Sequence, residues 1–347
     1  MTRTAKPIWI ATGGTAGHIF PALAVADELT ARRCRLIISS DGRGMKYVRD
    51  YAAGNAAARP AFVWASGVGA KNALFKILSL VKMAATTAAL AIRFLFSRPA
   101  RIVAFGGYSS VPVLIAGRMW RIPTFLHEQN AAIGRANKFA MPFVRTLMTS
   151  FPIGCGVHTG LPVRKDIRDA KRDPAPKPEP RLLVMGGSLG AAILDDVVPR
   201  AVAELKRKVF VIHQTRPENV EKVRKAYAGY GIKNNVLSFI RDVAGEMSAA
   251  TLVVCRAGAS TVAEMQTIGV PAVLVPLGIN PDQLANAKAF AKNGGGGVME
   301  QRDLDATMLA KTLGGLLWNP GKLAKMAAAA YVENDAAKRI ADTILDN

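Results

Sequence analysis

The sequence TLVVCRAGASTVAEMQTIGVPAVLVPLGINPDQLAN, residues 251–286, decides the fold that we predict for this chain. Its apolar run at 252–255 predicts a strand, the small residues at 256–259 predict a tight loop, and Thr261 opens a predicted helix. A second apolar run, at 272–275, is followed by another loop and another helix. Strands that alternate with helices predict a parallel α/β sheet, which binds ligands at the carboxyl ends of its strands.

The loops of this stretch have the chemistry of a nucleotide-sugar pocket. A helix that begins after a loop of small residues offers backbone N–H groups to a phosphate, and Glu264 and Gln283 can read sugar hydroxyls. The spacing of Thr261 and Glu264 also matches a capping box, in which the two side chains satisfy backbone donors at the start of a helix. Both interpretations remain open from this stretch alone.

The rest of the chain repeats the pattern and predicts two similar α/β domains across a cleft. The glycine pairs Gly13-Gly14 and Gly186-Gly187 follow strands and lie 173 residues apart, about half of the 347-residue chain. The proline-rich segment 161–180 predicts a connector. We therefore expect an N-terminal domain at 1–163, a C-terminal domain at 164–335, and a helix at 336–347 that packs back on the first domain. Further strands are predicted at 8–12, 36–39, 101–105, 124–126, 181–185, 209–212 and 236–239, and helices at 19–33, 111–120, 191–206 and beyond 304.

The positive charge of the chain is concentrated in its first half. Residues 1–165 hold 22 Lys and Arg against 5 Asp and Glu, whereas residues 166–347 hold 24 against 20. No carboxylate occurs between Asp50 and Glu128. This asymmetry predicts an anionic partner for the first half, either a membrane surface or a nucleic acid. The interleaved aromatic and basic residues of RNA-binding modules are absent from the sequence, which argues against nucleic acid.

Segment 72–96 is apolar but contains Lys76, Lys82 and Arg93. Because these charges interrupt it, we expect that it does not span a bilayer. It is either a core helix with snorkelling lysines or an interfacial helix on anionic lipid. In the second case the membrane face comprises Leu74, Phe75, Lys76, Leu78 and Lys82.

The cysteines and the N-terminus indicate a cytoplasmic protein. Cys34, Cys155 and Cys255 lie far apart in or beside apolar segments, so we expect reduced core residues and no zinc site. The chain enters its first strand without the apolar region of a signal peptide.

The loop Gly13-Gly14-Thr15-Ala16-Gly17-His18 has the composition of a phosphate cradle at a helix N-terminus. It lacks the full dinucleotide and P-loop patterns, so a plain turn between strand and helix is the alternative. His18 is suited to proton transfer near neutral pH. The run His127-Glu128-Gln129-Asn130, after another apolar strand, predicts a cleft wall.

The sequence Gly186-Gly187-Ser188-Leu189-Gly190 formally matches the nucleophile elbow of hydrolases. That fold needs an acid and then a histidine downstream, and His213 comes one strand later with no acid-bearing strand between. We reject a hydrolase. Ser188 is either a phosphate ligand or a helix N-cap, and Arg164 is either a linker charge or a phosphate clamp.

Taken in order, six motifs resemble the MurG-type N-acetylglucosaminyltransferases of peptidoglycan synthesis. They cover nearly the whole chain: ATGGTAGHIFPALAVA, FGGYSS, HEQNAAIGRANK, TGLPVR, GGSLGA, and CRAGASTVAE with GVPAVLVPL and QLANA. The resemblance implies the glycosyltransferase-B fold, two Rossmann-like domains. It also implies inverting transfer of N-acetylglucosamine from UDP-N-acetylglucosamine to the C4 hydroxyl of undecaprenyl-pyrophosphoryl-N-acetylmuramyl-pentapeptide, at the cytoplasmic face of the cell inner membrane.

The resemblance also implies roles for individual residues. His18 is the candidate general base, and Glu264 would hold the ribose hydroxyls in the catalytic complex. The acceptor pyrophosphate would meet Gly13, Gly14, Thr15, Gly106 and Gly107. UDP-N-acetylglucosamine would contact Thr15, Ala16, Gly17, Asn130, Arg164, Ser188, Ile240, Ala259, Ser260, Thr261, Val262, Ala263, Glu264 and Gln283.

Two positions depart from the family pattern. Ala16 replaces a glycine, and alanine would be strained there if the backbone needs a positive φ. The loop before Gln283 is short. No D-x-D metal site is evident in the loops of the predicted pocket, so we expect no cofactor and no obligatory metal. The alternatives are a UDP-N-acetylglucosamine 2-epimerase of the same fold and a catalytically silent, membrane-docked nucleotide-sugar-binding protein.

Overall fold

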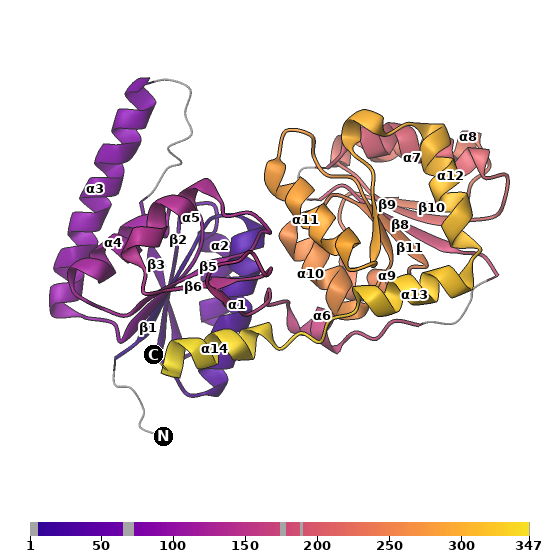
Figure 1. The fold of residues 1–347 in the computed structure, drawn as a ribbon. Coiled ribbons are helices and arrows are strands. Elements are labelled where there is room, and N and C mark those ends of the chain that lie inside the picture. The colour runs from indigo at the N-terminus through magenta and orange to yellow at the C-terminus, as the bar shows by residue number, and fades with distance from the viewer. Residues whose placement is uncertain (1–5, 65–72, 174–177, 188–189, 347) are drawn as a thin grey trace. The chain divides into compact units, whose positions relative to one another are not determined.

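The computed structural model describes residues 6–64, 73–173, 178–187 and 190–346, with the side chains of 73–76 left out. The chain divides into two compact units. The first unit comprises Met1–Arg164 together with Asn334–Asn347, and the second comprises Lys165–Glu333 (Figure 1). Each unit is a parallel α/β sheet with its own core, as the sequence predicts.

The first unit contains a seven-stranded parallel sheet in the order β3-β2-β1-β4-β5-β6-β7. The order reverses between β1 and β4, and the loops that follow these two strands therefore lie side by side at one edge. Its elements are β1 (Ile8–Thr12), α1 (Ala16–Ala31), β2 (Leu36–Ser40), α2 (Met45–Ala53), β3 (Ala58–Phe62), α3 (Ala73–Phe96), β4 (Arg101–Phe105), α4 (Val111–Met119), β5 (Thr124–Glu128), α5 (Arg135–Ala140), η1 (Met141–Phe143), β6 (Thr146–Thr149), β7 (Val157–His158) and α14 (Ala336–Asp346).

Both faces of this sheet are covered, which explains why its central strands are apolar throughout. Along β1, Ile8 and Ile10 face a core shared with α1 and α14, whereas Trp9 and Ala11 face a core shared with α3 and α4. Side chains alternate across a strand, so one five-residue run supplies both cores.

The second unit contains a six-stranded parallel sheet in the order β10-β9-β8-β11-β12-β13, which reverses between β8 and β11. Its elements are α6 (Lys165–Asp169), β8 (Arg181–Met185), α7 (Ala192–Glu204), β9 (Phe210–Gln214), η2 (Pro217–Asn219), α8 (Val220–Gly229), β10 (Asn234–Leu237), α9 (Val243–Ala249), β11 (Leu252–Cys255), α10 (Ala259–Ile268), β12 (Ala272–Leu274), α11 (Pro281–Lys292), β13 (Gly296–Val298), η3 (Gln301–Asp303), α12 (Ala306–Leu317) and α13 (Pro320–Ala330).

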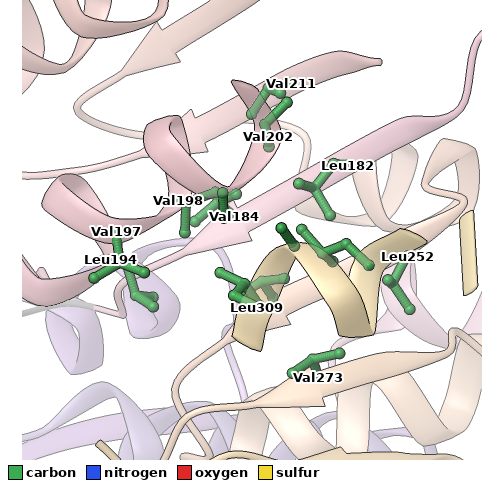
Figure 2. Packing of buried hydrophobic residues seen from close by; sticks show 14 of the residues in the cluster. Leu182, Val184, Leu194, Val197, Val198, Val202, Val211, Leu252, Val273 and Leu309 are labelled. Carbon is green, nitrogen blue, oxygen red and sulfur yellow. The ribbon is translucent and has the colours of Figure 1, made fainter. Parts of the chain in front are cut away.

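One core of the second unit lies between the sheet and helices α7 and α12 (Figure 2). Strand residues such as Leu182 and Val184 of β8 meet Leu194 and Val198 of α7, all at most 1% exposed, and Leu309 joins them from α12. The first turn of α7, directly after the glycine loop, is therefore fixed by packing as well as by backbone hydrogen bonds.

The last helix, α14, belongs to the first unit although it follows the second unit in the chain (Figure 1). It lies against α1, and Ile340 and Ile344 are buried in the first unit's core. Arg32 pairs with Asp342 at 2.5 Å, and Arg101 donates to the Leu345 carbonyl at 3.0 Å.

Helix α3 is long and apolar enough to cross a membrane over its residues 77–96, by length and composition alone, and 22% of that window is buried. The sequence-based expectation that its charges exclude a span was therefore too strict, because this stretch holds only Lys82 and Arg93. Both alternatives for the helix have some support: Phe94 is buried against Trp9, whereas Val81 and Leu95 on other parts of its surface are exposed.

The predicted strands at 8–12, 101–105, 181–185 and 252–255 are confirmed to the residue. The prediction missed α2, β3, β6, β7, α8 and β13, which are short or broken by polar and small residues.

Cys34 and Cys255 are buried and free, as expected, but Cys155 is free and exposed. The expectation that Cys155 is a core residue is wrong because it lies on a surface turn between Gly154 and Gly156, both with positive φ.

Candidate active site

The glycine loop of the first unit is partly helical. α1 begins at Ala16, three residues before the predicted start, with Thr15 as an N-cap that makes no side-chain capping bond. Among the described residues, the non-glycine positions with positive φ are Arg33, Arg121 and Lys206. The concern that Ala16 is strained is therefore wrong, because this position is an ordinary first residue of a helix.

Glycines bring two neighbouring loops into direct contact at the point where the sheet order reverses. A Cβ atom on Gly107 would lie 2.7 Å from the Gly13 Cα atom, and one on Gly14 would lie 2.0 Å from Asp41 Oδ1. Gly106 and Gly107 also have φ values of 74° and 79°, which favour glycine. The structure thus brings together the glycines that the resemblance assigns to the acceptor pyrophosphate.

His18 lies in the first turn of α1, half-buried between these loops. Its Nδ1 is 2.8 Å from Thr15 Oγ1, and the other edge of its ring packs beside Gly106. Burial, together with the smaller effect of the nearby Arg43, lowers the pKa of His18 to about 4, while Asp41 opposes the shift. His18 is therefore neutral at pH 7 and able to accept a proton.

Glu128, at the end of β5, organises the loop that follows it. It is 1% exposed, and its carboxylate accepts from Asn130 N at 2.9 Å, Asn130 Nδ2 at 3.1 Å, Gly134 N at 2.9 Å and Asn137 Nδ2 at 2.7 Å. Four N–H donors on one carboxylate fix the loop and the orientation of Asn130.

The run His127-Glu128-Gln129-Asn130, predicted as a cleft wall, consists mostly of buried side chains. The first three side chains are buried, and His127 Nε2 hydrogen-bonds the Gly160 carbonyl at 2.9 Å. Burial lowers the pKa of His127 to about 4. Sequence reasoning missed Glu128 and Asn137 as the pair that supports the loop, although both lie inside the quoted HEQNAAIGRANK motif.

In the second unit, the loop after β8 leads into α7 with Gly187 and Gly190 at φ values of 76° and 66°. The N-cap residue of α7 is Ala191, which makes no side-chain capping bond. Ser188, the residue predicted to bind phosphate or to cap this helix, lies outside the described residues.

Helix α10 corrects the capping-box interpretation of Thr261 and Glu264. The helix begins at Ala259 with Gly258 as its N-cap, so Thr261 is its third residue. Thr261 is therefore not the N-cap residue, and Glu264 is not the N3 residue, that a capping box requires. Glu264 lies close enough to Cys255 that its charge, after burial, raises the pKa of that thiol.

The residues predicted along 259–264 divide into two faces. Ala259, Val262 and Ala263 are at most 9% exposed and pack into the unit. Ser260, Thr261 and Glu264 are half-buried, and the hydroxyl oxygen of Ser260 is itself buried.

The loop before α11 holds Gln283 in place. Its Oε1 accepts from Leu277 N at 2.9 Å, and Asn280 caps the helix by accepting from Asp282 N at 3.0 Å. The short loop therefore orders Gln283, and the amide nitrogen is the end of its carboxamide available to donate to a ligand.

Two residues that sequence reasoning missed tie these loops together. Arg256 is 8% exposed and its Nη1 donates to the carbonyls of Val275 at 3.1 Å and Pro276 at 3.3 Å. Asn286 is fully buried and donates to the Ala257 carbonyl at 3.1 Å. An arginine and an asparagine inside apolar runs are the sequence signal that could have identified them.

Of two other predicted residues, one is enclosed in the second unit and one belongs to the first unit. Ile240 is 5% exposed, so its side chain is mostly packed inside the second unit. Arg164 belongs to the first unit, and its guanidinium lies 5.4 Å from the ring centroid of Phe20 on α1. Leu78 and Lys82 of the expected membrane face lie on α3, whereas the side chains of Leu74, Phe75 and Lys76 fall outside the described residues.

Comparison with known proteins agrees with this arrangement along the whole chain. Residues 8–149 match the glycosyltransferase family 28 N-terminal domain, and residues 181–344 match its C-terminal domain. The UDP-N-acetylglucosamine--N-acetylmuramyl-(pentapeptide) pyrophosphoryl-undecaprenol N-acetylglucosamine transferase of Phenylobacterium zucineum is 40% identical, over 98% of each chain. The protein of the same name from Sinorhizobium fredii is 39% identical, over 97% of this chain and 94% of the other.

Solved glycosyltransferase structures also match this chain along nearly its whole length. MurG of Acinetobacter baumannii superposes with a TM-score of 0.80 at 30% identity, over 98% of this chain and all of the other. The kitacinnamycin glycosyltransferase shares the fold, with a TM-score of 0.71 at 15% identity over 98% of each chain. The chain belongs to the MurG-type transferases of glycosyltransferase family 28.

Proposed function

We propose that this protein transfers N-acetylglucosamine from UDP-N-acetylglucosamine to undecaprenyl-pyrophosphoryl-N-acetylmuramyl-pentapeptide. The observation that carries the proposal is the match along the full length to transferases whose names state these substrates. The geometry supports it, because each unit presents a glycine loop followed by a helix that begins without a side-chain cap. Such helix starts bind phosphate groups, and both substrates contain a diphosphate.

In the proposed reaction the acceptor C4 hydroxyl attacks the anomeric carbon of the donor sugar. The new C–O bond forms as the bond to the diphosphate breaks, with inversion, and UDP leaves with the electron pair. His18 takes the hydroxyl proton, for which a neutral imidazole is required. Glu264 holds the ribose hydroxyls, and the uncapped start of α10 stabilises charge on the departing diphosphate.

We propose that the reaction needs no metal ion. Among the described residues, no group of three or more His, Cys, Asp or Glu side chains is placed to hold one. In this proposal the backbone donors of the helix starts and nearby guanidinium groups take over the neutralisation of the diphosphate.

Radiolabelled UDP-N-acetylglucosamine with the lipid-linked acceptor tests the function. We expect label in the lipid phase, and the same rate in EDTA-treated enzyme without added Mg²⁺. Epimerised free sugar would instead identify a 2-epimerase, and donor binding without turnover would identify a silent binding protein. Loss of all transfer in EDTA that Mg²⁺ restores would contradict the metal-free reaction alone.

We propose further that the first unit docks on the cytoplasmic face of the membrane through α3. Around Lys82, the large apolar side chains of Ile77, Leu78 and Val81 are each between 47% and 59% exposed. Lys82 Nζ lies 5.6 Å from the ring centroid of Trp64, which is itself 63% exposed. Exposed apolar groups beside basic ones are the pattern of an interfacial surface.

The Lys76→Glu/Lys82→Glu double variant is expected to weaken binding to vesicles of anionic phospholipid at least about thirtyfold, because it removes two basic residues that each contribute about 1 kcal/mol near such a surface. Wild-type binding should also fall as salt screens the attraction. The matched control is Lys311→Glu combined with Lys322→Glu, which makes the same charge change on the second unit. Equal binding by wild type and the α3 variant in cosedimentation would contradict docking through α3.

A further inference from the structure

The two units place an arginine at the same position relative to their glycine loops. Gly13 of the first loop and Gly186 of the second lie 173 residues apart, and so do Arg43 and Arg216. Each arginine follows the second strand of its unit, Arg43 after β2 and Arg216 after β9. In a sheet of this order the second strand neighbours the first, so each arginine follows a strand that adjoins its glycine loop.

In the second unit the arginine side chain lies against Gly190, the last residue of the loop. A Cβ atom on Gly190 would come within 2.5 Å of Arg216 Cγ, 3.1 Å of Nε and 3.3 Å of Cδ. Gly190 also has a φ of 66°, so any other residue there would be strained and would displace the arginine. The first unit has a similar contact, because a Cβ atom on Gly14 would lie 2.8 Å from Arg43 Cβ.

Buried polar groups fix the backbone that carries Arg216. Asn219 N donates to the Arg216 carbonyl at 2.9 Å, and Asn219 Nδ2 donates to Asp195 Oδ2 at 2.8 Å. Asp195, in the first turn of α7, also lies 3.2 Å from His213 Nε2, and both side chains are at most 2% exposed. The arginine is therefore tied to the same helix start that follows the glycine loop.

The two arginines differ in their acidic partners. Arg43 pairs with Asp41, whose buried carboxylate accepts from Nη2 at 2.8 Å and from Nε at 3.4 Å. The position equivalent to Asp41 in the second unit is the neutral Gln214. Glu218 lies 4.0 Å from Arg216 Nη1, and both side chains are more than half exposed, so this pair contributes little. The second unit thus has a neutral side chain at the position where the first unit has the carboxylate that pairs with Arg43.

We propose that the Arg216 guanidinium binds the diphosphate of the nucleotide sugar beside Gly190, as a donor-specific contact that the first unit lacks. This inference rests on the proposed function. A guanidinium presents paired N–H donors that match phosphate oxygens. Because the Arg216 side chain packs against Gly190, it would lie close to a diphosphate bound at this loop. It adds a side-chain cation to the backbone donors at the start of α7.

Calorimetric titration with UDP and with UDP-N-acetylglucosamine tests the proposal without requiring turnover. Arg216→Gln is expected to weaken both ligands about tenfold, the usual effect of one hydrogen bond to a charged group. Arg216→Lys keeps the positive charge but loses the paired N–H donors of the guanidinium, so its affinity for both ligands should lie between those of the wild type and Arg216→Gln. In the transfer assay, KM for the donor should rise about tenfold and KM for the lipid acceptor should stay within about twofold.

Arg224→Gln is the matched control, because Arg224 is an exposed arginine of the same unit that pairs with Glu221 three residues away. It should bind UDP as wild type does. Unchanged UDP affinity in Arg216→Gln, or an equal rise in both KM values with a lowered melting temperature, would overturn the inference. Failure of the wild-type protein to bind UDP at all would instead overturn the proposed function.

Discussion

His18→Asn is expected to lower kcat of sugar transfer at least about a hundredfold, since a positioned general base contributes about that much or more. Donor affinity should stay within about twofold, because the proton comes from the acceptor. Asparagine can keep a hydrogen bond to Thr15, which now lies 2.8 Å from His18 Nδ1. The start of α1 should therefore survive, so a loss of rate would report on chemistry. The measurement is steady-state transfer of labelled sugar together with UDP titration.

The pH dependence of the same reaction gives a second test. The folded pKa of His18, about 4, lies below its ordinary value of 6.5 because burial and Arg43 disfavour the cation. The neutral base is therefore present throughout the range from pH 5.5 to 8, and kcat/KM should show no imidazole limb near 6.5. The unfolded chain binds this proton below pH 6.5, whereas the folded chain binds it only near pH 4. His18 thus contributes a loss of stability as pH falls from 6.5 to 4.

His158→Gln is the control for both experiments, since His158 is an exposed residue of the short strand β7 and hydrogen-bonds only the Ser150 carbonyl among the contacts described. It should transfer sugar at the wild-type rate. An unchanged kcat in His18→Asn would remove His18 as the base, and a limb of kcat/KM near pH 6.5 would show that the residue titrates as if exposed.

The sequence predicted the central strands and the doubly wound architecture because buried parallel strands are short, continuous apolar runs between glycine loops. It predicted helix starts less well. Ala16 and Ala259 begin helices two or three residues before the predicted starts. Small residues in these loops satisfy both a turn and a first helical turn, and local composition does not separate the two.

The candidate site shows the same limit. Glycines predicted as phosphate cradles are close together in the first unit, since their role depends on local backbone geometry. The supporting residues could not be predicted, because their roles depend on partners that are remote in sequence. Asn286 reaches a carbonyl 29 residues away, and Asp195 meets a histidine from the next strand. A pattern within one loop carries no information about such contacts.

Glu128→Ala is expected to destabilise the first unit by about 3–5 kcal/mol, at the upper end of single-residue effects. The substitution removes the acceptor of four hydrogen bonds and leaves their donors beside a buried cavity, and each buried donor without an acceptor costs about 1–3 kcal/mol. Asn130 and Asn137 would lose their common partner. The loop after β5 should loosen, and KM for the lipid acceptor should rise more than KM for the donor.

Differential scanning calorimetry with and without UDP can separate the two units, whose unfolding need not be one transition. A ligand raises the transition of the unit that binds it, so in the proposed function UDP marks the second unit. Glu128→Ala should lower the other transition and leave the UDP-sensitive one in place. Asp50→Ala, an exposed carboxylate change on α2, should shift neither by more than about 0.5 kcal/mol. If Glu128→Ala unfolds like the Asp50 variant, the carboxylate does not hold the loop, and Asn130 must be positioned by other contacts.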